Sequence, residues 1–262
     1  MVTFSPLRSL ARFINNIVRQ LEMTRCNSAI ALAATILSVG SIARAQVGST
    51  DGFAFGLRLG YALPMGTEGR IAVQGTTATG SNSLSDDFKG MIPIIIDAGY
   101  RINPSIYVGA FFQYGFMSIN TDNSSNYSCT TGIDCSAHDI QIGANLHYHI
   151  LPAASFDPWV GIGVGYEWVG LSAKGTVSVL GTSFSVDESI RVHGFQFLNL
   201  QAGGDFRATP DFGVGPFISL SLGQYSSYSM TDNAANTTTS GDMTDKGLHE
   251  WFTIGVRGQY NL

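Results

Sequence analysis

The side chains most able to do chemistry are charged or amide groups that recur at every second position of short apolar segments. Arg58, Asp97 and Glu167, for example, each stand between two apolar residues. A charge in such surroundings is stable only when it is paired or hydrogen-bonded. We therefore expect these side chains to converge on one enclosed polar network. Its expected members are Arg58, Asp97, Arg101, Gln113, Asp139, Gln141, Asn145, Glu167, Gln201, Asp205 and Arg257.

Serine, histidine and a carboxylate could instead form a nucleophilic site that acts on lipid. The candidates for such a site are His138, Asp139, Ser189 and His193. A nucleophile, its base and an orienting acid must lie within mutual reach. No Ser/His pair occupies neighbouring same-face positions of one segment, so we expect no enzyme activity and keep a lipid-modifying enzyme as an alternative.

Neither a cofactor nor a metal is expected. The histidines do not show the paired ligand spacing of a metal site, and His147 and His149 are interpreted as hydrogen-bonding groups inside the fold. Cys26 falls in the N-terminal leader, which leaves Cys129 and Cys135. Two cysteines in an oxidising compartment predict a disulfide that closes a small loop.

Eight segments alternate between apolar and polar residues, which is the period of a strand with two unlike faces. The expected strands are about 53–61, 92–101, 106–116, 139–150, 160–168, 198–207, 214–223 and 251–262. Short connections containing proline alternate with long ones rich in Ser, Thr, Asn and Gly. The long ones are about 64–90, 118–137, 170–193 and 225–248, and the third could carry its own hairpin across Gly181.

Residues 1–45 are interpreted as a leader. The part from Met23 to Ala45 has a basic start, an apolar stretch over 29–39 and an Ala-Arg-Ala cleavage site, so it predicts a signal peptide that is cleaved after Ala45. Either Met1 or Met23 could be the start. Five of the 14 basic and one of the 19 acidic residues fall in the leader. The expected mature domain, 46–262, therefore carries a net charge of −9, which argues against nucleic acid as a partner.

The apolar face of the strands is expected to meet lipid. Aromatic residues on that face gather at the strand ends, as in the two interfacial belts of a membrane barrel. The expected belts contain Tyr61, Tyr114, Phe116, Tyr166 and Trp168 at the long connections and Tyr100, Tyr148, Phe206 and Tyr260 at the short ones. Nearly every charged residue in the strands lies on the opposite, polar face.

The eight segments, their alternating connections and the terminal segment from Trp251 to Leu262 resemble the OmpA-like and OmpX-like outer-membrane β-barrel family. The resemblance implies an all-β, eight-stranded, antiparallel, up-and-down transmembrane barrel. Short turns and both termini would face the periplasm, and four long loops the exterior. It also implies that Tyr260 and Leu262 form the signal read by the barrel-assembly machinery.

Four functions remain open from the sequence. The first is a structural or surface-interaction barrel in the bacterial outer membrane, with a lumen largely filled by polar side chains. The others are a small pore for cations or solutes, a lipid-modifying enzyme and a soluble periplasmic barrel that binds a lipid. The partners expected for the first are outer-membrane lipid and lipopolysaccharide, the export and barrel-assembly machinery, and an extracellular ligand bound by the loops.

Overall fold

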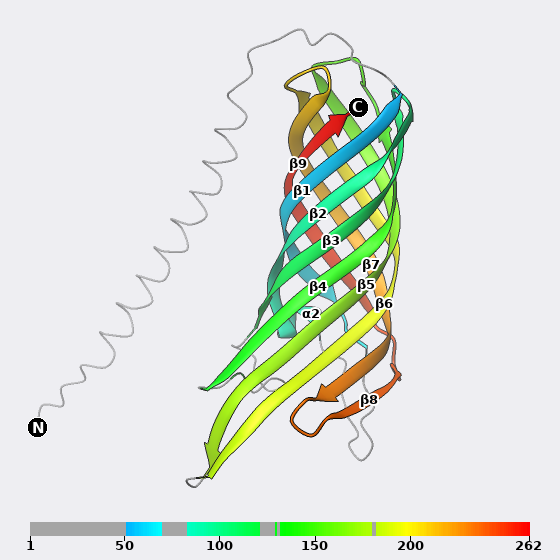
Figure 1. The fold of residues 1–262 in the computed structure, drawn as a ribbon. Coiled ribbons are helices and arrows are strands. Elements are labelled where there is room, and N and C mark those ends of the chain that lie inside the picture. Colours follow the sequence, from blue (N-terminus) through cyan, green and yellow to red (C-terminus); the bar gives the residue numbers. More distant parts are fainter. Residues whose placement is uncertain (1–50, 70–82, 121–128, 130–131, 180–181) are drawn as a thin grey trace, which may run out of the picture. The chain divides into compact units, whose positions relative to one another are not determined.

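The computed structural model describes residues 51–69, 83–120, 129, 132–179 and 182–262. The predicted leader and its cleavage site lie outside these residues. The described chain forms nine strands and one short helix (Figure 1). They are β1 (Gly52–Gly66), α2 (Leu84–Asp87), β2 (Phe88–Asn103), β3 (Ile106–Ile119), β4 (Ile133–His149), β5 (Phe156–Val179), β6 (Thr182–Arg207), β7 (Phe212–Asp232), β8 (Thr237–Asp242) and β9 (Leu248–Asn261).

Eight of the strands close into a ring, and every pairing in it is antiparallel. Consecutive strands pair from β1 to β7, β7 pairs with β9, and β9 pairs with β1. The strand β8 pairs with the part of β7 that extends past the ring. We call the end of the barrel with the three short connections the turn end and the opposite end the loop end. The predicted eight-stranded up-and-down barrel is confirmed.

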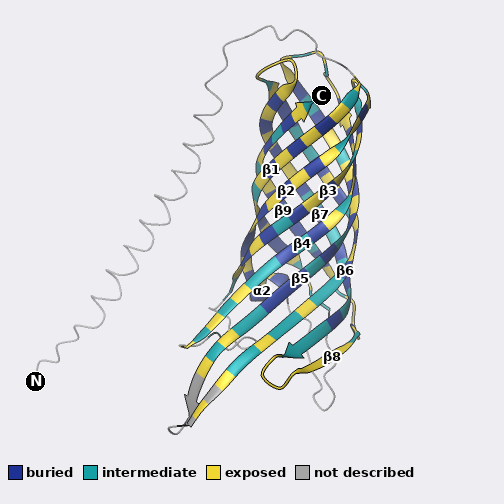
Figure 2. Ribbon diagram, in the orientation of Figure 1, coloured by how far each residue is buried: buried dark blue, intermediate teal, exposed yellow. Residues whose placement is uncertain are grey.

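The barrel has a polar interior and an apolar exterior. Ile96 on the outer face is 52% exposed, whereas its neighbour Asp97 is 2% exposed. Figure 2 shows this alternation as exposed and buried bands that cross the strands of the ring. Leu57, Phe112, Ile142 and Val164 are likewise exposed on the outer face. Within the described residues, no helix is long and apolar enough to cross a membrane.

Two of the predicted long loops are largely strand. The stretch 170–193 continues β5 and β6, which pair as far as Val179 and Thr182, and 225–248 contains the end of β7 and all of β8. The predicted hairpin within 170–193 is therefore present. These extensions carry polar residues on both faces, such as Asp187 and its neighbour Glu188 in β6. A ribbon with water on both sides needs no apolar face, so the two-faced pattern ends while the pairing continues.

A bulge in β6 explains why its pattern was the weakest. The register with β7 shifts between Gln196 and Leu198, and the register with β5 shifts between Gly163 and Gly165. An extra residue in one strand reverses the side-chain alternation beyond it. Both Gln196 and Asn199 consequently point inward and are buried.

The interior is apolar at the loop end. The buried residues there are Ala62, Leu84, Phe88, Met91, Met117, Val169, Leu171, Tyr225, Tyr228, Met243 and Trp251. A cavity of about 60 Å³ remains among them, lined by Phe88, Val169, Leu171 and Tyr225 among others. From the sequence, polar side chains were expected to fill most of the lumen. The polar filling instead ends near Glu167, and an apolar layer covers it.

Candidate functional site

A hydrogen-bonded cluster crosses the centre of the lumen. Arg58 of β1 donates two hydrogen bonds to the Asp97 carboxylate of β2, at 2.8 and 2.7 Å, and a third to Gln201 Oε1 at 3.0 Å. Asn145 Nδ2 donates to Asp97 Oδ1 at 2.9 Å, and Asn145 Oδ1 accepts from Gln201 Nε2 at 2.8 Å. Four strands are joined in this way, and the two charges neutralise each other out of contact with water.

A second cluster lies between this centre and the apolar layer. Glu167 of β5 accepts hydrogen bonds from Tyr225 Oη at 3.1 Å, His249 Nε2 at 2.8 Å and Trp251 Nε1 at 3.2 Å. The Tyr225 and His249 rings stack with their centroids 3.9 Å apart. Three donors from β7 and β9 thus hold one buried carboxylate, which joins the two sides of the barrel.

Asp139 of β4 belongs to the same level of the lumen. Its Oδ2 accepts from Gln113 Nε2 at 2.6 Å and from Gln141 Nε2 at 3.0 Å. Gln196 Nε2 in turn donates to Gln141 Oε1 at 3.1 Å. The polar network therefore continues from β3 through β4 to β6.

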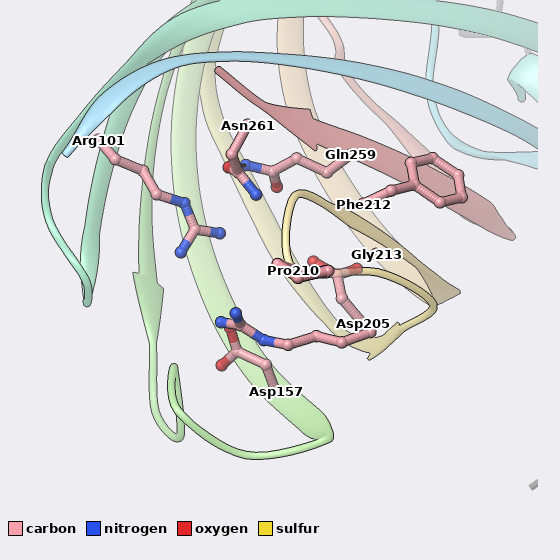
Figure 3. A pocket seen from close by; sticks show the side chains of 9 residues that line it. Arg101, Asp157, Asp205, Pro210, Phe212, Gly213, Gln259 and Asn261 are labelled. Atoms are coloured by element: carbon pink, nitrogen blue, oxygen red, sulfur yellow. Dashed lines mark hydrogen bonds and ion pairs between the residues drawn. The ribbon is translucent and has the colours of Figure 1, made fainter. Parts of the chain in front are cut away.

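Charged groups also close the turn end. Arg101 Nη2 is 3.3 Å from His149 Nε2, and His149 Nδ1 is 2.8 Å from Asp157 Oδ2. Because an arginine can only donate, these contacts require Nε2 to accept and Nδ1 to carry the proton. Arg207 also approaches Asp157, at 3.8 Å. Figure 3 shows the side chains of Arg101 and Asp157 pointing into a small hollow at this mouth.

All eleven residues predicted for the polar network point into the lumen and are buried. Six further members were not predicted, namely Asp157, Trp159, Gln196, Tyr225, His249 and Trp251. Gln196 was hidden by the bulge in β6. His249 and Tyr225 lie outside the predicted strands, and Asp157 stands beside Pro158, in what was interpreted as a turn. Of these residues, only Trp251 could have been predicted, because it lies at an inward-facing position of a predicted strand.

All nine aromatic residues of the expected belts lie on the outer face, half-buried or exposed. Cys129 and Cys135 form a disulfide, with their Cα atoms 5.8 Å apart. Tyr260 and Leu262 are exposed at the end of β9. No group of three or more potential metal ligands occurs in the described part of the chain.

The predicted catalytic candidates do not form one site. Asp139 is buried in the lumen, whereas His138 lies on the outer face and stacks on Tyr114 with centroids 6.0 Å apart. Ser189 pairs with Ser172 and Thr231 in the strand extensions. His193 instead contacts Ser227, which was not among the candidates predicted from the sequence.

A contact between two acidic residues at the loop end predicts that the stability of the fold depends on pH. Glu68 follows β1, and burial, then the charge and hydrogen bond of Asp87, raise its pKa well above the ordinary 4.5. The folded state therefore holds a proton that the unfolded state releases, so stability falls as pH rises from about 4.5 through the raised pKa. In Glu68→Gln we expect this contribution to vanish. Chemical unfolding at pH 4.5 and pH 8 should show the variant gaining on the wild type at pH 8. An equal difference at both pH values would contradict the assignment.

The inverted polarity of the closed ring defines the class of protein: an integral membrane β-barrel of the outer-membrane type, since a closed barrel leaves no strand edge unsatisfied in hydrocarbon. No protein-family model and no curated protein matches the sequence.

Solved structures with a similar fold include three outer-membrane or surface proteins. OprG from Pseudomonas aeruginosa is 12% identical over 83% of this chain and 100% of its own, with a TM-score of 0.47. A major outer membrane protein from Thermus thermophilus is 11% identical over 81% and 100%, with a TM-score of 0.46. Neisserial surface protein A is 14% identical over 82% and 100%, with a TM-score of 0.40.

Proposed function

We propose that this chain is an outer-membrane barrel with a plugged lumen that works at the cell surface through its extended sheet. The observation that carries the proposal is the stack of buried hydrogen-bonded clusters, one around Arg58 and Asp97 and the others around Glu167 and Asp139. Its side chains come from opposite sides of the barrel and meet in the middle. An eight-stranded barrel is just wide enough for side chains to fill, and the apolar layer at the loop end adds a second barrier.

The surface role is supported by the part of the sheet beyond the ring. The strands β5, β6, β7 and β8 continue past the ends of their neighbours at the loop end (Figure 1). Both faces of β8 (Thr237–Asp242) are polar, and Lys174 and Asp187 form an ion pair at 3.5 Å between β5 and β6. This polar ribbon suits contact with water, lipopolysaccharide headgroups or an extracellular ligand.

The proposed orientation follows from the two ends of the barrel. The turn end carries short connections and the C-terminal end of β9, which suits the periplasmic side, and the extended sheet suits the exterior. Export and barrel-assembly machinery are the partners that such a chain needs for insertion. The exposed Tyr260 and Leu262 are the residues proposed to be recognised during assembly.

Conductance in planar bilayers tests the plug. The refolded wild type should give no stable openings, because the proposed plug would block the water path at the Arg58–Asp97 cluster. Replacing Arg58 and Asp97 together by alanine should produce openings, since it removes both large side chains and the charge pair at one level. The matched control replaces Lys174 and Asp187 by alanine outside the ring and should stay closed. Stable openings in the wild type would favour the pore instead.

A further inference from the structure

The outer face carries a contact between a hydroxyl and an imidazole. Ser227 Oγ of β7 lies 2.7 Å from His193 Nε2 of β6, and both residues are half-buried. In the sheet, His193 stands between Ser227 and Trp168 of β5, which belongs to the aromatic belt. The pair therefore faces outward at the level of that belt. Alternation in the sequence predicts Ser/His pairs only along a single strand, whereas this pair joins two strands.

A bulge in β7 creates the contact. Tyr225 points inward and pairs with Gly194, so strict alternation would also turn Ser227 inward. Ser226 is the extra residue at the register shift. Its hydroxyl donates to His193 O at 3.2 Å, and its carbonyl accepts from Met243 N at 2.9 Å. Bulges of this kind re-aim a side chain and are common beside active sites.

The geometry of the pair suits nucleophilic catalysis. When His193 carries its proton on Nδ1, Nε2 is free to accept the proton of Ser227 Oγ, as a general base does for a serine nucleophile. The Tyr166 ring lies 6.0 Å from the imidazole, centroid to centroid, and helps to orient it.

The outward residues on either side of the pair differ in polarity, with an apolar residue toward the membrane centre and a charged residue away from it. Two residues along β6 toward the membrane centre, Phe195 is 51% exposed on the same face. Two residues the other way, about 7 Å along the strand, Arg191 is exposed on that face. An acyl chain would lie against Phe195, its ester beside Ser227, and an anionic headgroup beside Arg191. This order matches a phosphorylated lipid that stands in a leaflet.

We propose that Ser227 and His193 hydrolyse an acyl ester of an anionic lipid in the leaflet at the loop end. Ser227 Oγ attacks the ester carbonyl carbon, and its proton passes to His193 Nε2. The bond between the carbonyl carbon and the alcohol oxygen breaks, and the leaving alcohol takes that proton. Water, deprotonated by His193, then cleaves the acyl-serine. The products are a fatty acid and the deacylated lipid, and Ser227 regains its proton.

The test uses the full barrel folded into vesicles of phosphatidylglycerol or of lipopolysaccharide. We expect the wild type to release fatty acid from one of these compositions, which identifies the lipid, and to form a fluorophosphonate adduct on Ser227. Ser227→Ala should abolish both signals, and His193→Gln should slow release about 100-fold or more. Ser229→Ala, the next outward residue on β7, is the matched control and should behave as the wild type. Arg191→Ala should raise the KM for the anionic lipid more than it lowers kcat.

Heat-shifted mobility on a gel checks that each variant is folded. If Ser227→Ala fails to fold, the rate of fatty-acid release by His193→Gln tests the proposal. The proposal is overturned if folded wild type releases fatty acid no faster than these variants from both compositions. That failure would leave the plugged lumen untouched, because conductance tests the lumen separately. An adduct that persists in Ser227→Ala would equally overturn it.

Discussion

Replacing Asp97 by alanine should lower the free energy of unfolding by about 3–5 kcal/mol, because it leaves the Arg58 guanidinium buried and without its counter-ion. Arg58 would keep only its hydrogen bond to Gln201, and Asn145 would lose an acceptor. The wild-type arrangement, with two short hydrogen bonds between buried groups, is the kind whose disruption is most expensive. Urea unfolding of the barrel in lipid vesicles measures the change.

The control for this prediction is Asp187→Ala in the extended sheet. That carboxylate pairs with the exposed Lys174, and such surface pairs contribute under about 1 kcal/mol. Replacing Arg58 and Asp97 together by apolar residues of similar volume should lose less than Asp97→Ala alone, since no unpaired charge remains. If Asp97→Ala and Asp187→Ala have equal effects, the central ion pair does not stabilise the barrel.

Placing arginine at Ile96 should lower the free energy of unfolding by about 2–4 kcal/mol, the penalty for a charge facing hydrocarbon at mid-depth. Ile96 lies four residues from Tyr100, which belongs to the aromatic belt at the turn end, and it is exposed on the outer face of β2. In water the same substitution on an exposed residue would have almost no effect. Folding into vesicles and unfolding with urea therefore measures what surrounds the outer face.

Ile102 provides the matched control for that substitution. It lies on the same strand and face and is 56% exposed, close to the 52% of Ile96, but it stands beyond Tyr100. Arginine there should change the free energy by about 0–1 kcal/mol, because a charge near the interface reaches water. Equal effects at the two positions would mean that depth does not matter and that lipid does not cover this face.

The ring of strands could be predicted from the sequence because a membrane barrel imposes a different solvent on each face. Leu57, Arg58 and Leu59 show this contrast within three residues. Of the strand extensions, only the hairpin within 170–193 was predicted. In β8 (Thr237–Asp242) both faces are polar, so no contrast remains. Backbone pairing holds these residues, and it leaves no pattern in the side chains.

The sequence predicts which residues belong to the polar network, but it does not predict which of them contact one another. Alternation places Arg58, Asp97 and Glu167 inside, yet it does not say which of them meet. The partners depend on the stagger of the strands and on bulges. Gln196 and Ser227 are the clearest cases, because a single extra residue in β6 or β7 decides which way each of them points. The apolar layer was missed because Val169 and Leu171 continue the inward phase of Glu167 with side chains of the opposite kind.

The pairing between β1 and β9 sets the order of events during biogenesis. Ala54 lies opposite Asn261, so the ring cannot close until β9 is in place. Until then Glu167 lacks two of its hydrogen-bond donors, His249 and Trp251 of β9. Loss of β9 should therefore leave the ring open, with the edges of β1 and β7 unpaired.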